Sequence, residues 1–205
     1  RRDFTINSIY SDFEGCIFDP FNGVKDLKKN IVRFIGNPIS RIEEDNLRLL
    51  RYFRFLGTYS SSEQQLDSKS LNACLENFSK IQTLSKERVQ LEFFKLLLSK
   101  NVNFVLIILK NNNLLNFIID GMQEISYQNI NLLNKLPKEL IIRIAYIIKK
   151  TKIKIITLNN SLKIGKNNIA KLEKILAVKN SINSENEAKI NKYYYGEEVA
   201  LVSYK

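Results

Sequence analysis

The stretch RIEEDNLRLLRYFRF, residues 41–55, decides how the rest of the chain is interpreted. At 100° per residue its apolar and charged side chains separate onto opposite faces, which predicts one amphipathic helix. Ser40 and Glu43 have the S-x-x-E spacing of a capping box, and Gly57 is a typical C-terminal stop. The apolar face gathers Ile42, Leu49, Leu50, Phe53 and Leu56. The opposite face gathers Arg41, Glu44, Asp45, Arg48 and Arg51, with Phe55 intruding among them.

Asp45 and Arg48 have a spacing that gives this charged face two interpretations. Residues three apart are neighbours on a helix, so the face can simply be solvated and held by weak ion pairs. Alternatively, the carboxylate accepts hydrogen bonds while the guanidinium donates them. Such a pair matches the Watson–Crick edges of cytosine and adenine, and it rejects uracil and guanine by leaving polar groups unpaired. This second interpretation predicts a site that selects a base.

Four short motifs carry a resemblance to a known family. The segment EDNLRLLRYFRF resembles the E-D-x-x-R-x-x-R motif of the bacterial-type (class II) tRNA nucleotidyltransferases and the related poly(A) polymerases. RRDFTINS at residues 1–8 is similar to that family's second motif, with Ser8 where alanine is usual. DPFNGVKDL at 19–27 resembles its third motif, and SKERVQLEFFKLLLS at 85–99 resembles its fifth. The order of the four motifs also matches.

The resemblance implies a nucleotide-binding role for five residues. Arg2 and Asp3 would contact the ribose, and Asp45 with Arg48 would serve as a protein template for the base. Arg51 would reach the triphosphate, because a guanidinium matches phosphate geometry. The other interpretation of Arg2 is a frayed terminal charge. In the third motif, Asp19, Gly23 and Asp26 would be structural, and the helix of the fifth motif would brace the recognition helix.

The family's catalytic carboxylates are missing from this sequence. Two-metal nucleotidyl transfer needs carboxylates that hold Mg²⁺ against the triphosphate. The family supplies them from an Asp-x-Asp pair next to a Gly-Gly turn, and the sequence contains neither pattern. We therefore expect no catalytic residue and no metal ligand in this segment, with Mg²⁺ bound by an upstream head part. The chain, which begins at Arg1, is expected to be a segment of something longer and inactive alone.

Composition excludes several classes of protein. The longest apolar run, residues 104–109, is far too short to span a membrane, and no secretory signal is present. Cys16 and Cys74, with no histidine in the chain, give neither a disulfide framework nor a zinc site. Each is expected to be a small buried hydrophobe in a reducing cytoplasm.

The net charge of +11 is unevenly distributed. Residues 1–57 sum to +2, residues 58–134 to zero and residues 135–205 to +9. A surplus in the last third is typical of a surface that meets phosphates, although a merely soluble basic tail gives the same count. Tyr193, Tyr194 and Tyr195 would either stack on bases or pack a final helix.

The expected fold is mainly α: a helical neck and body preceded by a small α/β remnant from the edge of a head sheet. The remnant, residues 1–36, should hold a helix at 5–10, strands at 16–18 and 31–35, and a short helix ending at Lys29. The neck would be 37–112 and the body 113–205. Further helices are expected at about 69–77, 86–98, 102–111, 126–134, 138–150 and 163–179.

The leading hypothesis is a segment of an RNA 3′-end nucleotidyltransferase, for CCA addition to tRNA or for poly(A) addition. Its partners would be ATP and CTP, a tRNA or another RNA 3′ end, and a separate head polypeptide. The alternatives are a non-catalytic RNA-binding module from a split gene and a decaying helical remnant. The sequence leaves these three open.

Overall fold

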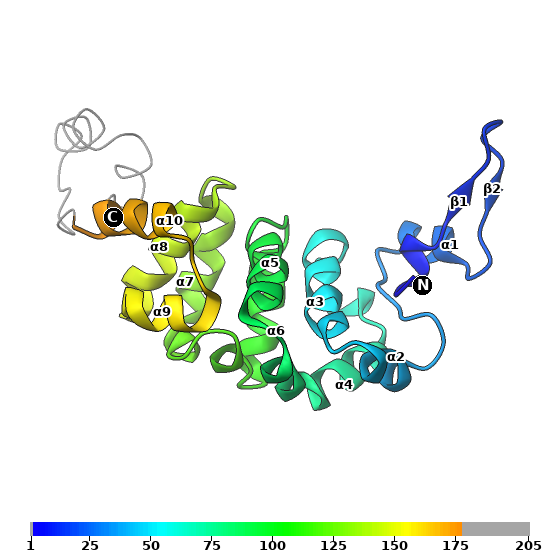
Figure 1. The fold of residues 1–205 in the computed structure, drawn as a ribbon. Coiled ribbons are helices and arrows are strands. Elements are labelled where there is room, and N and C mark those ends of the chain that lie inside the picture. Colours follow the sequence, from blue (N-terminus) through cyan, green and yellow to red (C-terminus); the bar gives the residue numbers. More distant parts are fainter. Residues whose placement is uncertain (1, 178–205) are drawn as a thin grey trace.

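The computed structural model describes residues 2–177 and shows a curved row of helices with a β-hairpin at one end (Figure 1). The expected mainly helical fold with a small α/β block in front is confirmed. None of the helices within residues 2–177 is long and apolar enough to cross a membrane. The tyrosine cluster at 193–195 lies outside the described residues.

The N-terminal block contains less regular structure than its sequence predicts. A 3₁₀ turn, Thr5–Asn7, replaces the helix expected to continue to Tyr10, which instead begins strand β1, Tyr10–Ser11. Strand β2, Ile17–Phe18, pairs antiparallel with β1. Helix α1 follows at Gly23–Lys28. The strand expected at 31–35 is wrong: only the isolated bridges Phe4–Phe34 and Val32–Leu66 form there, because the pairing with residues 3–5 ends at the 3₁₀ turn.

The single helix predicted at 41–55 is two helices. Helix α2 spans Pro38–Glu44 and helix α3 spans Leu47–Tyr59, with Asp45 between them in an extended conformation at φ −158° and ψ 109°. The Asp45 carboxylate accepts the amide of Leu47 at 3.0 Å, as short polar side chains do at helix starts. The capping box is also wrong, since Asn37 caps α2 through the amides of Ile39 and Ser40.

Gly57 lies inside α3 and does not end it. Its backbone oxygen accepts the amide of Asn101 at 2.8 Å. A Cβ at this position would lie 2.4 Å from Ser99 Oγ and 3.0 Å from a methyl group of Leu96. Glycine is thus required for the close approach of α3 to α5 rather than for a turn.

The remaining helices largely follow the predicted order. Helices α4 (Ser68–Glu76), α5 (Lys86–Leu97), α6 (Val102–Asn111), α7 (Tyr127–Leu132) and α8 (Leu140–Thr151) match expected segments. Helix α9, Ile155–Leu162, is not expected from the sequence, and α10 spans Lys166–Ala177. Short 3₁₀ turns lie at Glu63–Gln65, Phe78–Thr83, Leu115–Phe117, Met122–Glu124 and Leu133–Lys135. Ser85 caps α5 by accepting the amide of Arg88.

Helices α3 and α5 form the most extensive contact between two elements of the described residues. All five predicted apolar residues of 41–56 are buried, as are Val89, Phe93, Leu96 and Leu97 of α5. Glu92 of α5 is buried and forms an ion pair with Arg54 of α3 at 2.6 Å. An aromatic cluster of Phe4, Phe34, Tyr52 and Phe55 joins the N-terminal block to α3. The expectation that α5 braces α3 agrees with this packing.

We expect Gly57→Ala to destabilise the protein, although alanine favours helix by about 1 kcal/mol. The new methyl overlaps the buried Ser99 hydroxyl, which donates to Leu96 O at 2.7 Å. Overpacking of about 1–3 kcal/mol and loss of that hydrogen bond should leave a net loss of about 1–2 kcal/mol in urea unfolding. Gly57→Ala with Ser99→Ala should recover part of the loss. Gly165→Ala, where a Cβ meets nothing within 4 Å, is the control, and equal stability of both single variants contradicts the packing argument.

Candidate nucleotide-recognition site

A buried carboxylate, Asp3, holds two arginines of α3. Arg48 Nε donates to Asp3 Oδ1 at 2.8 Å, and Arg51 Nε donates to Asp3 Oδ2 at 2.6 Å. Only 6% of Asp3 is exposed. The structure thus brings Asp3 together with two arginines that lie 45 and 48 positions further along the sequence.

Glu44 at the end of α2 gives Arg48 a second carboxylate. Arg48 Nη1 donates to Glu44 Oε2 at 2.5 Å, and Arg41 donates to the same oxygen at 2.6 Å. The hydrogen bond from Arg48 lowers the pKa of Glu44. Burial opposes the charge on Arg48, but its bonds to Glu44 and Asp3 outweigh burial and raise its pKa. Arg48 also donates to the backbone oxygen of Arg41 at 2.6 Å, so its position is strongly constrained.

Asp45 faces a different partner. Arg88 of α5 donates from Nη2 to both carboxylate oxygens of Asp45, each at 3.0 Å. The prediction that Asp45 and Arg48 are neighbours on one helix is wrong, because the chain leaves the helix at Asp45. The two side chains still lie on either side of one break, between α2 and α3. Neither residue lines the hollow beside α9 or the hollow beside α1.

The Asp45–Arg88 pair is more accessible than the Asp3 cluster. The side chains of Asp45 and Arg88 are 37% and 45% exposed, whereas that of Asp3 is 9% exposed. Exposed ion pairs contribute about 0–1 kcal/mol. A ligand group that donates to Asp45 can therefore displace Arg88 at small cost, while Arg48 stays in position.

Arg2 is exposed, and its backbone oxygen accepts a hydrogen bond from Arg41. This contact ties residue 2 to α2. The third motif behaves as a structural element. Asp19 accepts the amides of Gly23 and Val24 at the start of α1, and Asp26 is buried and accepts the Thr5 hydroxyl at 2.7 Å.

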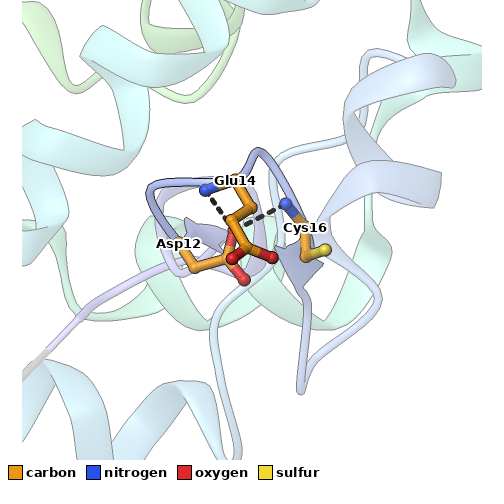
Figure 2. Close-up of side chains that lie close together, drawn as sticks. All are labelled: Asp12, Glu14 and Cys16. Carbon is orange, nitrogen blue, oxygen red and sulfur yellow. Dashed lines mark hydrogen bonds between the residues drawn. The ribbon is translucent and has the colours of Figure 1, made fainter.

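The hairpin turn carries a cluster of possible metal ligands, Asp12, Glu14 and Cys16, whose ligand atoms lie within 4.8 Å of one another (Figure 2). All three residues are exposed, so the expectation that Cys16 is buried is wrong, whereas Cys74 is buried as expected. Burial raises the pKa of the Cys74 thiol. Asp12 Oδ1 accepts the amides of Glu14 and Cys16, at 3.0 and 2.8 Å. We assign this carboxylate to the turn.

Sequence reasoning missed Arg88 as a site residue. It lies three positions after the cap Ser85, inside the fifth motif, and periodicity places it on the polar side of its helix. Nothing in that pattern identifies a partner 43 residues away. The only available signal is the motif itself, which by itself indicates a scaffold helix.

The excess positive charge of the last third of the chain lies entirely within residues 135–177, which the structure describes. Residues 135–177 contain eleven Lys and Arg residues against two Glu, whereas residues 178–205 contain four Lys and four Glu. The lysines at 150, 152, 154, 163, 166, 171 and 174 are exposed on α8–α10 and their connections. Arg143, by contrast, is buried and donates to the backbone oxygens of Leu97, Leu136 and Pro137.

Two family models and several curated proteins match parts of this sequence. The family model described as the poly A polymerase head domain matches residues 1–33, and the one described as the probable RNA and SrmB-binding site of polymerase A matches residues 65–125. The mitochondrial CCA tRNA nucleotidyltransferase 1 of Homo sapiens is 44% identical over 106 residues, covering 52% of this chain and 24% of the relative. The CCA-adding enzyme of Staphylococcus epidermidis is 39% identical over 118 residues, covering 58% and 29%. The match thus spans about a quarter of the length of these curated relatives.

Solved structures share the fold over nearly the whole chain. The CCA-adding enzyme of Bacillus stearothermophilus in complex with CTP has a TM-score of 0.78 at 22% identity, covering 98% of this chain and 52% of that one. The Thermotoga maritima CCA-adding enzyme complexed with tRNA has a TM-score of 0.62 at 15% identity, covering 100% and 55%. With both family models, these relatives and the fold in agreement, the chain is similar to the class II tRNA nucleotidyltransferases and poly(A) polymerases.

Proposed function

We propose that this chain supplies base recognition and RNA binding to an RNA 3′-end nucleotidyltransferase that adds CCA to tRNA. The observation that carries the proposal is the convergence of Asp3, Arg48 and Arg51 in one cluster, directly beside Asp45 at the helix break. The names of the relatives favour CCA addition over poly(A) addition. Residues 1–36 would be the end of a head domain, 37–112 the neck and 113–205 the body that contacts RNA.

Each residue of the cluster has a proposed task. Asp45 would accept the amino group of cytosine or adenine after Arg88 moves aside, and Arg48 would donate to the adjacent ring nitrogen. Asp3 and Glu44 hold the Arg48 guanidinium, so it is ordered before a base arrives. Arg51 would turn toward the triphosphate, and Arg2 would contact the ribose. Since both oxygens of Asp3 accept from arginines, we propose that Asp3 chiefly positions them.

The described residues do not fit a pair of Mg²⁺ ions at this site. Mg²⁺ binds carboxylate oxygens and waters in octahedral geometry. The three carboxylates of the cluster, on Asp3, Glu44 and Asp45, each pair with an arginine. We therefore propose that the metal chemistry belongs to a head part outside this chain.

The hairpin offers a surface for that head part. Tyr10, Phe13, Ile17 and Phe18 of β1, β2 and their turn are all exposed, and a two-stranded sheet is marginally stable alone. We propose that further head strands, from the same or a separate polypeptide, cover this hairpin. A non-catalytic RNA-binding module is the second candidate, favoured by the charge of residues 135–177.

The chain alone should incorporate no nucleotide with Mg²⁺, and it should incorporate CTP and ATP into tRNA lacking its 3′ end when a complementary head is added. Asp45→Ala should then reduce discrimination against UTP and GTP by about 10- to 100-fold, since a polar site rejects a mismatched edge through unpaired groups. The measurement is kcat/KM for each nucleotide. Glu63→Ala, on an exposed turn, is the control. Unchanged selectivity in Asp45→Ala would contradict the template role.

Arg88→Met should reduce discrimination against UTP and GTP, measured as the ratio of kcat/KM values to that for CTP, by about tenfold, because no residue then competes with the base for Asp45. Arg88→Lys should restore part of this discrimination. The double variant with Asp45→Ala should be no worse than Asp45→Ala alone, since residues that act together are not additive. If the effects of the two substitutions on this kcat/KM ratio add in the double variant, Arg88 acts independently of Asp45. Lys95→Met, on the same helix and paired within residues 2–177 with Glu92 alone, controls for loss of charge on α5.

Binding of tRNA by the full chain should weaken steeply with salt, because lysines on α8–α10 displace counterions from phosphates. Replacing Lys150, Lys152 and Lys154 by Gln should reduce the slope of log K against log salt by about one for each phosphate that is no longer neutralised. Lys69→Gln on α4 should leave the slope unchanged. A flat salt response of the unmodified chain would exclude this surface as the RNA-binding one.

A further inference from the structure

A hollow of about 330 Å³ lies beside α1, away from the Asp3 cluster. Its wall contains three cationic side chains, one aromatic ring and one buried carboxylate. The lining residues are Phe21, Asn22, Lys25, Asp26, Lys29, Ile31 and Arg33. Lys25 belongs to the third motif, but the proposed base-recognition site uses none of the cations of this hollow.

The single carboxylate that lines the hollow does not neutralise its three cationic side chains. Asp26 accepts the Thr5 hydroxyl at 2.7 Å and Arg33 Nε lies 3.3 Å from it, so this carboxylate is occupied. Arg33 also lies 3.5 Å from Asp67, yet its side chain remains 46% exposed. Lys25 on α1 and Lys29 directly after its end are four positions apart and both exposed, and within residues 2–177 neither has an ion-pair partner. The wall therefore carries an excess of two positive charges.

The ring of Phe21 adds an apolar surface to this positive wall. Phe21 is 46% exposed, directly before Asn22, which adopts the left-handed conformation at φ 57°. An exposed aromatic ring beside lysines is how proteins hold single-stranded nucleic acid: the base stacks on the ring while the cations contact the backbone. The volume is at the lower end of the range for small-molecule sites, which suits one nucleotide.

We propose that this hollow binds one nucleotide of a single-stranded RNA. Lys25, Lys29 and Arg33 hold its phosphodiester, and its base stacks on Phe21. A phosphodiester carries one negative charge, which the excess of two positive charges accommodates beside the Asp26 carboxylate. A free triphosphate would bring further charges toward that carboxylate. The hollow also adjoins the segment that begins with Asp3, because Asp26 binds Thr5, so the bound nucleotide lies at the same end of the molecule as the base-recognition site.

The test compares Lys25→Gln/Lys29→Gln with Lys28→Gln in the full chain. Lys28 is exposed on the same helix but does not line the hollow. The probe is a fluorescein-labelled single-stranded adenosine octamer, and its affinity is measured by fluorescence anisotropy across a salt series. The double variant should bind about tenfold more weakly at low salt, and its salt slope should be smaller by about 0.7, the value for one phosphate on a single strand. Lys28→Gln should match the unmodified chain.

A second variant tests the stacking independently of charge. Phe21→Leu should weaken octamer binding about tenfold, and Phe21→Tyr should preserve it, because stacking on an aromatic ring contributes about 1–3 kcal/mol per base. Phe13→Leu, at a fully exposed hairpin position, is the matched control. If Lys25→Gln/Lys29→Gln behaves like Lys28→Gln, or if Phe21→Leu behaves like Phe13→Leu, the proposal is overturned.

Two further outcomes separate this proposal from others. Loss of ATP or pyrophosphate binding in the double variant, with octamer binding unchanged, would mean that the hollow takes a free phosphate compound and would overturn the RNA assignment. Loss of tRNA binding only on substitution of the α8–α10 lysines would overturn this inference and leave the proposed function intact. Circular dichroism of each variant establishes that it is folded.

Discussion

The rest of the site depends on the ion pairs that the buried Asp3 carboxylate forms with Arg48 and Arg51. Removing a carboxylate from water costs several kcal/mol unless charged partners compensate, and Arg48 and Arg51 provide that compensation through one oxygen each. Because Asp3 lies in the N-terminal block and the arginines lie on α3, the same contact joins block to helix. The aromatic cluster around Phe4 packs beside it, so burial and charge fix one orientation of α3.

The break between α2 and α3 gives Asp45 its freedom. In a continuous helix its side chain would lie beside Arg48 and pair with it, which would cancel both groups. The extended backbone at Asp45 instead turns the carboxylate toward Arg88 of α5, while Arg48 remains with Asp3 and Glu44. Donor and acceptor are thus held by separate partners, and neither neutralises the other.

Local patterns in the sequence predict much of the fold and little of this pairing. The burial of Ile42, Leu49 and Phe53 follows from helical spacing, and the cap at Ser85 follows from its position before α5. The helix break escapes prediction because the apolar spacing continues across it and hides the preference of Asp45 for a helix start. The role of Gly57 escapes prediction because its constraint comes from Ser99, and no local pattern encodes a contact 42 residues away.

The ion pairs of the site differ in how readily they exchange, and this difference suits template-like recognition. Arg48 has two carboxylates and a backbone oxygen as partners, and its side chain is 13% exposed, so breaking its contacts leaves a buried charge uncompensated. The side chains of Asp45 and Arg88 are both half-exposed, so solvent screens their charges when the ion pair breaks. Under the proposed function, an incoming base edge would meet a fixed donor, Arg48, and an acceptor, Asp45, whose present partner resembles the amino group it would receive. In this proposal, a base that cannot donate to Asp45 would leave Arg88 in place, and discrimination would arise from competition with a residue of the protein itself.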